Sequence, residues 1–582
     1  MTIEKEKWYS GIISGAQEVM ANKKYLNKIN VFPVADGDTG SNLFSTMHSI
    51  VTYSEVKSTV KYTMESIADS ALTGARGNSG LIFAQYFQGL SEAVGDDELT
   101  PEDFVSASSN GFRYAYEAVD NPIEGTILTT MQVFHESLNE YMENNNNFMM
   151  ALEAAYEMVV QAVERTTQQL MVLKKASVVD SGAKGFAYFI KGFIHGFKNE
   201  KPVCVSVEKS PEIVHVHEET FNFRYCSEAL IGDCKNIKKD DLKNFGDCLI
   251  MAGSNRKTRI HIHTDEPMKF FEYLSDRGII LEQKCDDMHL QYERVHHPKY
   301  SRVIVTDSIA DIPKEFLDEE QVHMIPLTLL VGEVSYFDKL TISNEHVFKL
   351  AKKMNVHPHS SQPTIKTVEN AFDYLLDYYD EIIVLTVAKA LSGTFQVFKN
   401  VSKKYDQIHV IETKQNSVAQ GLLLYETMID LKNNISTEDI LKKLDYRIKR
   451  SKILVQIKSL DPMIASGRLS TKMGRLLKSF GVKPIITLDE TGKGAIYKVT
   501  LTNKKSYKEI LKHIKIAHMK HNITSYAITY IDDKVLAEDF SNSIEQLIGI
   551  KPVYITKSSS IIAVGAGSGA VGVGYITERK QS

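Results

Sequence analysis

The spacing of apolar residues changes along the chain, and this change constrains the fold more than any other feature of the sequence. Up to about residue 198, apolar residues such as Trp8, Ile12 and Val19 recur at intervals of three and four, as in amphipathic helices. This pattern predicts an all-α domain over residues 1–200, with glycine-containing loops between the helices. Further helices are expected near residues 61–73, 79–94, 101–118, 124–143, 147–169 and 183–198.

Strand-like segments begin after residue 200. "KPVCVSVEK", "DCLIMAGS" and "TRIHIHTDEP" predict the strands of a small α+β domain over residues 201–297, with helices near 238–245 and 267–277. Over residues 298–582, runs such as "SRVIVTD", "EIIVLTVA" and "SYAITYID" alternate with helical patterns, which predicts an α/β domain with a parallel sheet. The glycine-rich apolar tract from Ile561 to Ile576 is expected to form a buried strand and a tight turn.

Composition narrows the class of protein. The chain has 582 residues and a formal net charge of −5, so no strong field favours nucleic acid. Its five cysteines do not make a disulfide framework. The segment "MTIEKEKWYSGIISG" lacks the long apolar stretch of a signal peptide. We therefore expect a cytoplasmic protein that binds no nucleic acid and has no transmembrane segment.

The segment "ADGDTGSN" places two carboxylates, Asp36 and Asp38, around a single glycine. Glycine permits the bend that lets such carboxylates converge, and Mg²⁺ prefers oxygen ligands that it shares with phosphate. A helix that opens with Thr39 offers free N–H groups to an anion. The segment is also compatible with a surface turn followed by an N-cap.

Three further loops in the same domain carry glycines and small polar residues. They are "TGARGNSG", "NPIEGT" and "VVDSGAKG". Four such loops in one helical domain favour a metal–phosphate site over simple linkers, and no GxxxxGK[ST] motif is present, so the site is not a P-loop. Arg76 could neutralise phosphate or pair with a neighbouring acid.

Together with "NKINVFPVADGDTGSNL", these loops resemble the nucleotide-binding domain of the dihydroxyacetone-kinase L-subunit (DAK2) family, and more narrowly the kinase component of bacterial fatty acid kinase. The resemblance implies an all-α barrel of eight helices that holds ATP with two Mg²⁺ ions. It implies metal binding by Asp36 and Asp38, with Asn30 at the position of a third ligand. The positions that it places on nucleotide-contacting loops are Ser41, Asn42, Asn78, Ser79, Thr126 and Asp180.

Two histidines, His261 and His263, lie two residues apart in a predicted strand and are therefore expected on one face. Beside a thiol they could bind a soft cation, or relay a phosphoryl group or a proton. They could also be half-buried strand residues with hydrogen bonds to the backbone. The segment resembles the middle domain of the same kinase component, which implies that Cys226, His261 and His263 are required for function and that the domain forms a homodimer.

Small hydroxyl residues follow the predicted strands of the last domain. Ser360 lies in "SSQPT" and Ser392 in "ALSGTFQ", and such residues bind ligands at strand ends or simply cap helices. The ordered motifs resemble the DegV family of fatty-acid-binding proteins. That resemblance implies two α/β subdomains around an apolar tunnel for an acyl chain, with Ser360 and Ser392 at its carboxylate and Arg468 near the head group.

One departure from the DegV pattern concerns the C-terminal motif. Where that family usually has a histidine that contacts the carboxylate, the stretch "VGAGSG" has Gly565, and Ser568 replaces a proline. Loss of such a charge-assisted partner costs about 1.5–3 kcal/mol of binding energy.

These features lead to one principal expectation about function. The chain is expected to be an ATP-dependent kinase that phosphorylates the carboxylate of a fatty acid, giving acyl-phosphate for phospholipid synthesis. A separate DegV-type fatty-acid-binding protein is a possible partner. The alternatives are a kinase of the dihydroxyacetone type that acts on a small molecule, and a lipid-binding regulator without catalysis.

Overall fold

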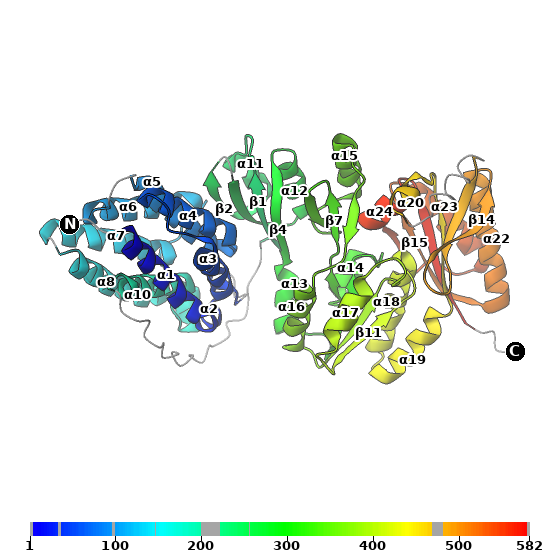
Figure 1. The fold of residues 1–582 in the computed structure, drawn as a ribbon. Helices are drawn as coiled ribbons and strands as arrows, with labels where there is room; N and C mark the ends of the chain where they lie inside the picture. The colour runs from blue at the N-terminus through cyan, green and yellow to red at the C-terminus, as the bar shows by residue number, and fades with distance from the viewer. Residues whose placement is uncertain are drawn as a thin grey trace. The chain divides into compact units, whose positions relative to one another are not determined.

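The computed structural model describes residues 4–32, 37–95, 99–145, 147–198, 222–254, 257–467 and 481–578 (Figure 1). It divides into two compact units, residues 1–291 and 292–582. The predicted strand "KPVCVSVEK" (201–209) lies outside the described residues, as do His215 and His217, two further histidines that are two residues apart.

The first unit begins with a helical region. Among the residues described up to 198, eight helices have 15 to 22 residues, as the resemblance implied, and two short helices accompany them. The six expected helix ranges agree with the observed ones within about three residues. The helices are α1 (Lys5–Ala21), α2 (Lys23–Lys28), α3 (Thr39–Tyr53), α4 (Val60–Gly74), α5 (Gly77–Ala93), α6 (Pro101–Ala118), α7 (Ile127–Asn144), α8 (Phe148–Gln169), α9 (Met171–Ala176) and α10 (Ser181–Phe197).

Side-chain caps explain why several of these helices begin where they do. Thr100 accepts a hydrogen bond from the Asp103 amide, and Asp103 accepts one from the Thr100 amide, so α6 starts with a capping box. Thr59 and Asn147 cap α4 and α8 in the simpler way, by accepting from the amide three residues on. These caps satisfy backbone donors that a helix start leaves without intrahelical partners.

Helices α5 and α10 are buried over most of their surface and supply the aromatic core of the region. The ring of Phe83 lies 5.8 Å from that of Phe186 and 5.7 Å from that of Phe189, and Phe87 lies 5.4 Å from Phe189. Edge-to-face and tilted contacts of this kind stabilise the core beyond the area that they bury. The amino ends of these two rigid helices are therefore held in fixed positions.

A small antiparallel sheet completes the first unit, with strand order β2-β3-β1-β4. Ile250 and Ala252 on β2 join the hydrophobic core of the helical region. The buried Arg259 donates from Nε to the Leu72 carbonyl (3.1 Å) and from Nη2 to the Thr73 carbonyl (2.8 Å), which fixes β3 to the end of α4. Its elements are β1 (Tyr225–Gly232), α11 (Lys239–Leu242), the 3₁₀ helix Lys243–Phe245, β2 (Gly246–Ser254), β3 (Lys257–Thr264), α12 (Pro267–Ser275) and β4 (Ile279–Asp287), followed by α13 (Met288–His296).

The second unit is an α/β region with two main sheets. The first part contains β5 (Arg302–Asp307), α14 (Lys314–Glu319), β6 (His323–Ile325), β7 (Thr328–Val331), β8 (Val334–Phe337), α15 (Asn344–Met354), β9 (His359–Ser361), α16 (Ile365–Leu376), β10 (Glu381–Thr386), α17 (Thr394–Ser402) and β11 (Ile408–Glu412). The second part contains α18 (Ser417–Lys432), α19 (Thr437–Ile448), β12 (Ser451–Gln456), α20 (Asp461–Ala465), β13 (Lys483–Leu488), β14 (Gly494–Thr500), α22 (Asn503–His521), β15 (Ile523–Tyr530), α23 (Lys534–Ile548), β16 (Ile555–Lys557), α24 (Ser560–Ala566) and β17 (Val571–Thr577).

The prediction of a parallel sheet is correct for one of these sheets and wrong for the other. The sheet β11-β10-β5-β6 is parallel throughout. In the sheet β14-β13-β12-β17-β15-β16, only β15 and β16 pair in parallel. Strands that are buried on both faces have the same apolar pattern whichever way they pair, so periodicity does not distinguish the two arrangements.

The tract from Ile561 to Ile576 also differs from expectation in its first half. It forms α24 from the second residue of that helix onward, as well as β17, because Ser559 accepts a hydrogen bond from the Ile562 amide and so starts a helix. None of the described helices has the length and apolar character needed to cross a membrane.

Candidate functional site

Helix starts that are far apart in the sequence converge in the helical region. A methyl group added at Gly77, the first residue of α5, would lie 2.2 Å from Asn42 Nδ2 on α3. One added at Gly182, in the first turn of α10, would lie 3.5 Å from Ser79 Oγ on α5 and 3.2 Å from Ile127 Cβ on α7. The structure therefore brings together the amino ends of α3, α5, α7 and α10, which carry the four loops singled out in the sequence.

The start of α3 holds the residues predicted to bind metal. Asp38 is the N-cap residue of α3, and Asp36 lies outside the described residues. Asn30 is buried and accepts a hydrogen bond from Thr39 Oγ1 at 2.7 Å, so it lies directly beside this helix start. The Ser41 amide and hydroxyl are both bonded to Asn27, at 2.8 and 2.9 Å. Sequence reasoning missed Asn27, which orients the first turn of α3.

The start of α5 contains a buried acceptor, Asn78 Oδ1, that has no hydrogen-bond partner among the described residues. Asn42, on the facing turn of α3, is also buried. Arg76 Nη2 forms an ion pair with Glu282 Oε2 of β4 at 3.1 Å, which is the second of the two roles expected for this arginine. The site thus offers an unpaired amide oxygen next to a series of helix amides.

At the starts of α7 and α10, the predicted residues Thr126 and Asp180 occupy the N-cap positions, but only the Asp180 side chain makes a capping hydrogen bond. The Thr126 hydroxyl donates to the Ile123 carbonyl at 2.8 Å. Asp180 is buried and accepts from the Ala183 amide at 2.7 Å. Burial raises the pKa of Asp180 to about 7, although hydrogen bonds from backbone amides act in the opposite direction. Asp180 therefore stabilises the start of α10, and its carboxyl group is protonated more readily than usual.

The sheet presents Cys226, His261 and His263 on one face, which we call the Cys–His face. In the antiparallel register Cys226 pairs with His263, and Glu228 pairs with His261. Residues two apart on a strand share a face, so the expected placement of both histidines is confirmed. Cys226 Sγ lies 3.8 Å from His261 Nδ1, and all three side chains place a donor atom within 4.8 Å of the others.

Glu228 connects this face to the helix starts. It is fully buried, and its Oε1 accepts from the Gly77 amide at 2.7 Å and lies 3.3 Å from His261 Nδ1. Burial acts to raise the pKa of Glu228, but the hydrogen bond from His261 and the charge of Lys284 lower it to about 2. A buried carboxylate thus joins the Cys–His face to the start of α5.

Lys284 and Asp286 on β4 extend the polar face, because β4 pairs with β1. Lys284 Nζ lies 2.7 Å from Asp286 Oδ2. Burial acts to lower the pKa of Lys284, but Asp286, Glu228 and Asp38 raise it well above its usual range. The effect of Asp38 on this pKa indicates that the start of α3 lies within electrostatic range of the sheet face.

Two members of the Cys–His face are neutral at pH 7. Burial raises the pKa of the Cys226 thiol well above its usual value, and the charges of Glu228 and Asp38 add to that effect. Burial and the neighbouring His261 lower the pKa of His263 to about 3. The sheet face therefore carries a protonated thiol and a neutral imidazole next to fixed charges.

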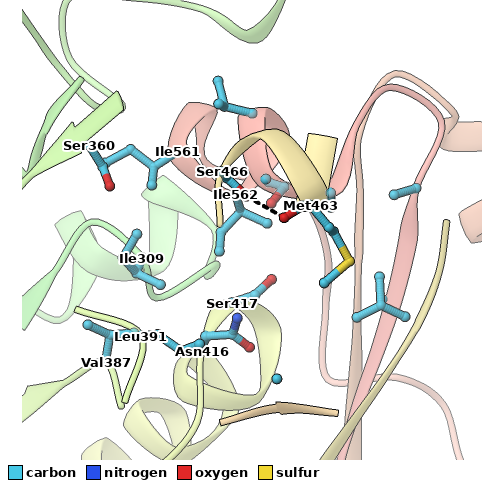
Figure 2. A pocket seen from close by; sticks show the side chains of 18 of the residues that line it. Ile309, Ser360, Val387, Leu391, Asn416, Ser417, Met463, Ser466, Ile561 and Ile562 are labelled. Atoms are coloured by element: carbon cyan, nitrogen blue, oxygen red, sulfur yellow. Dashed lines mark hydrogen bonds between the residues drawn. The ribbon is translucent and has the colours of Figure 1, made fainter. Parts of the chain in front are cut away.

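The second unit contains an apolar cavity of about 140 Å³ between its two main sheets (Figure 2). Ser360 and Ser392 both line it, and Arg468 lies outside the described residues. Figure 2 shows Ser360, Met463 and Asn416 on different sides of the same space. The apolar lining includes Ile309, Leu327, Val387, Ile453, Ile486 and Ile562.

Three of the polar side chains that line this cavity bind the same buried carboxylate. The hydroxyls of Ser417, Thr529 and Ser558 all donate to the buried carboxylate of Asp311, which sequence reasoning missed. Those hydroxyls are thus already engaged. Gly565 also lines the cavity, and a methyl group added there would meet no atom within 4 Å among the described residues.

Comparisons with known proteins match three family models in sequence order. The DAK2 domain matches residues 33–195, the FakA-like middle domain of fatty acid kinase matches 222–295, and the DegV family matches 301–578. The order and extent of these matches agree with the helical region, the small sheet and the α/β unit.

Among relatives, the chain is similar to an uncharacterised protein of Staphylococcus aureus strain USA300, with 28% identity over 459 residues that cover 72% of this chain and 81% of the relative. Among solved structures, it is similar to a fatty-acid-binding DegV-family protein from Thermus thermophilus (22% identity, TM-score 0.44, covering 47% of this chain and 99% of that one). It is also similar to DegV, a fatty-acid-binding protein from Bacillus subtilis (24% identity, TM-score 0.43, covering 48% and 99%).

Proposed function

Because the chain joins a DAK2 domain, a FakA-like middle domain of fatty acid kinase and a DegV-family region, we propose that it transfers the γ-phosphoryl group of ATP to the carboxylate of a fatty acid. An oxygen of the acyl carboxylate forms the new bond to phosphorus. The bond from phosphorus to the β–γ bridging oxygen breaks, and ADP leaves. The products are an acyl-phosphate and ADP.

The observation that supports this proposal most is the hydrogen bond from the Gly77 amide to Glu228. This bond connects the helix starts to the Cys–His face, two groups of residues that the sequence suggested independently. The first offers helix amides suited to phosphate, and the second offers a thiol and two imidazoles suited to an acceptor.

The residues at the helix starts are suited to a complex of ATP with Mg²⁺. Asp38 supplies carboxylate oxygens. The buried Asn78 Oδ1 has no hydrogen-bond partner among the described residues, so it is available to a donor or a cation of the bound ligand. When bound, Mg²⁺ would neutralise charge that develops on the phosphoryl oxygens. Asp36 and Asp38 would hold the metal, and Asn30 would orient the turn through Thr39.

The sheet face would then prepare the acceptor. Lys284 places a positive charge beside this face, and Glu228 keeps His261 in one orientation. Cys226, His261 and His263 would bind or orient the acceptor carboxylate. Most of the barrier lowering would come from position and charge neutralisation, as is usual in phosphoryl transfer.

The apolar cavity in the DegV-family region favours a lipid acceptor over a small polyol. The fatty acid would lie there, or in a separate DegV-type protein that docks on the chain. We also propose, from the resemblance of the middle domain, that the chain acts as a homodimer.

The test of this function uses the purified full chain with ATP, Mg²⁺ and oleate, with and without an added DegV-type fatty-acid-binding protein. Hydroxylamine traps an acyl-phosphate as the hydroxamate, and mass spectrometry identifies any lipid that co-purifies. Oleate-dependent hydroxamate formation supports the proposal. ATP consumption with dihydroxyacetone but not oleate would identify a small-molecule kinase, and bound lipid without any turnover would identify a regulator.

The cavity allows a gain-of-binding prediction. Gly565→His is expected to tighten oleate binding about 10- to 150-fold, because the site has room for a side chain and a charge-assisted hydrogen bond to a carboxylate contributes about 1.5–3 kcal/mol. Displacement of a fluorescent fatty acid measures the affinity. Gly95→His, at an exposed glycine of the first unit, is the control. If Gly565→His and wild type bind oleate with equal affinity, the carboxylate of the fatty acid does not lie near position 565.

A further inference from the structure

Among the described residues, two groups of side chains on the sheet could hold a metal ion, and they share His263. One is Cys226, His261 and His263, and the other is Asp247, Cys248 and His263. In each group the donor atoms lie within 4.8 Å of one another. Neither group shares a residue with the helix-start set to which the proposed function assigns magnesium.

The first group has the features of a preformed site. His261 Nε2 is buried and has no hydrogen-bond partner among the described residues. Its other ring nitrogen, Nδ1, lies 3.3 Å from Glu228 Oε1, and that carboxylate is itself held by the Gly77 amide. A carboxylate that orients a histidine through one nitrogen and leaves the other available is the usual outer support of a metal-ligating histidine.

The types of ligand atom in the first group indicate which class of metal ion it binds. One sulfur and two imidazole nitrogens suit Zn²⁺, whereas Mg²⁺ takes oxygen ligands almost without exception. Ligand atoms around a tetrahedral zinc ion lie about 3.5 Å apart, and each of these three side chains places one potential ligand atom within 4.8 Å of the others. We infer that Cys226, His261 and His263 bind one zinc-class ion.

The second group is less suited to a closed site. The Asp247 side chain is 36% exposed, and its Oδ1 lies 3.9 Å from His263 Nδ1. Cys248 lies in a β-bulge between Asp247 and Ile250 and has a positive φ of 53°. Asp247 and Cys248 therefore form the rim of the cluster, whereas Cys226 and His261 form its buried centre.

Three protein ligands leave the fourth tetrahedral position open, which is typical of zinc sites that take part in reactions. Glu228 connects these ligands to the start of α5, where the proposed function places the phosphates of the nucleotide. The assignment of that position to an oxygen of the acceptor carboxylate rests on the proposed function. The binding of the ion does not, because no nucleotide or lipid takes part in it.

The experiment uses the full chain, stripped with a chelator and titrated with Co²⁺ in the absence of nucleotide. Co²⁺ replaces Zn²⁺ in such sites, and a thiolate ligand produces a charge-transfer absorption in the near ultraviolet. We expect this absorption to saturate at one ion per chain, and excess Zn²⁺ to abolish it. Metal analysis of protein loaded with Zn²⁺ and then desalted should give one zinc per chain.

Single substitutions assign the ligands. Cys226→Ser should abolish the thiolate absorption, and His261→Ala should weaken Co²⁺ binding at least tenfold. Cys285→Ser is the matched control, because Cys285 pairs with Ser227 and so lies on the opposite face of the sheet. Glu228→Gln should weaken binding about 10- to 100-fold while the absorption band remains. Circular dichroism of each variant before titration shows that the chain is folded.

The inference is overturned if wild type shows no thiolate–cobalt absorption and retains no zinc. It is also overturned if Cys248→Ser abolishes the band while folded Cys226→Ser keeps it, since the ion would then lie in the rim group. Zinc binding without oleate-dependent turnover would contradict the proposed function and leave this inference intact, so the two failures are distinguishable.

Discussion

Asp38→Ala is expected to lower ATP turnover by at least about a hundredfold, the size found when one charge-stabilising group is removed from an active site. Asp38 lies at the start of α3, next to Thr39, which donates to Asn30, and its negative charge raises the pKa of Lys284. Without this carboxylate, the site loses an oxygen ligand for the metal that would bind the nucleotide phosphates. Turnover is measured as ADP release at saturating ATP, Mg²⁺ and acceptor.

The same substitution should leave the fold intact. Asp38 is the N-cap residue of α3, but its side chain makes no capping hydrogen bond, so its removal should destabilise the protein by at most about 1 kcal/mol. The melting profile should therefore shift by only a few degrees. Asp69→Ala removes an exposed carboxylate from α4 of the same region and should change neither turnover nor melting. Turnover by Asp38→Ala at the wild-type rate in saturating Mg²⁺ would refute the role of this residue.

Glu228→Ala is expected to cause the largest loss of stability of all these substitutions, about 3–5 kcal/mol in the first unit. It removes a fully buried carboxylate, leaves the Gly77 amide without its acceptor, and opens a void beside His261. Amide hydrogen exchange is the suitable measurement, because it reports each region separately. Protection should fall at the start of α5 and across β1 and β3, and remain unchanged in the second unit.

Glu228→Gln separates the shape of this side chain from its charge. The amide oxygen can still accept from Gly77, so most of the protection should return. The negative charge that orients His261 is absent, and turnover should stay low. Glu266→Gln, which alters an exposed pair with Lys269, is the control and should have little effect. If amide hydrogen exchange in Glu228→Ala equals that of wild type, the contact of Glu228 with Gly77 does not contribute to stability.

The sequence allowed the helices and the sheet face to be predicted because both depend on local patterns. A period of 3.6 residues gave α4 to α8 and α10 to within a few residues, and a period of two placed His261 and His263 on one face. Pairing direction in the sheet of β12 to β17 was wrong because it depends on contacts between distant strands. The helix α24 was missed because a single serine, Ser559, caps an otherwise strand-like tract.

The candidate site shows the same division. Asp38, Cys226 and the two histidines stand out by residue type and spacing. Glu228 does not, although the alternation of Cys226 and Glu228 along β1 would have placed both on one face. Its importance arises from a contact with Gly77, 151 residues away in the sequence. Asn27 is similar, since it matters only because α2 packs against α3 and brings its amide to Ser41. Such residues can be found only once the elements are packed.

The central claim is that the converging helix starts bind a complex of magnesium with a nucleoside triphosphate. Isothermal calorimetry of the full chain with a non-hydrolysable ATP analogue tests it most directly. Heat of binding at one site per chain is predicted in the presence of Mg²⁺, with none after its chelation and none for Asp38→Ala. Absence of binding by wild type, or binding of equal strength with and without Mg²⁺, would contradict the claim.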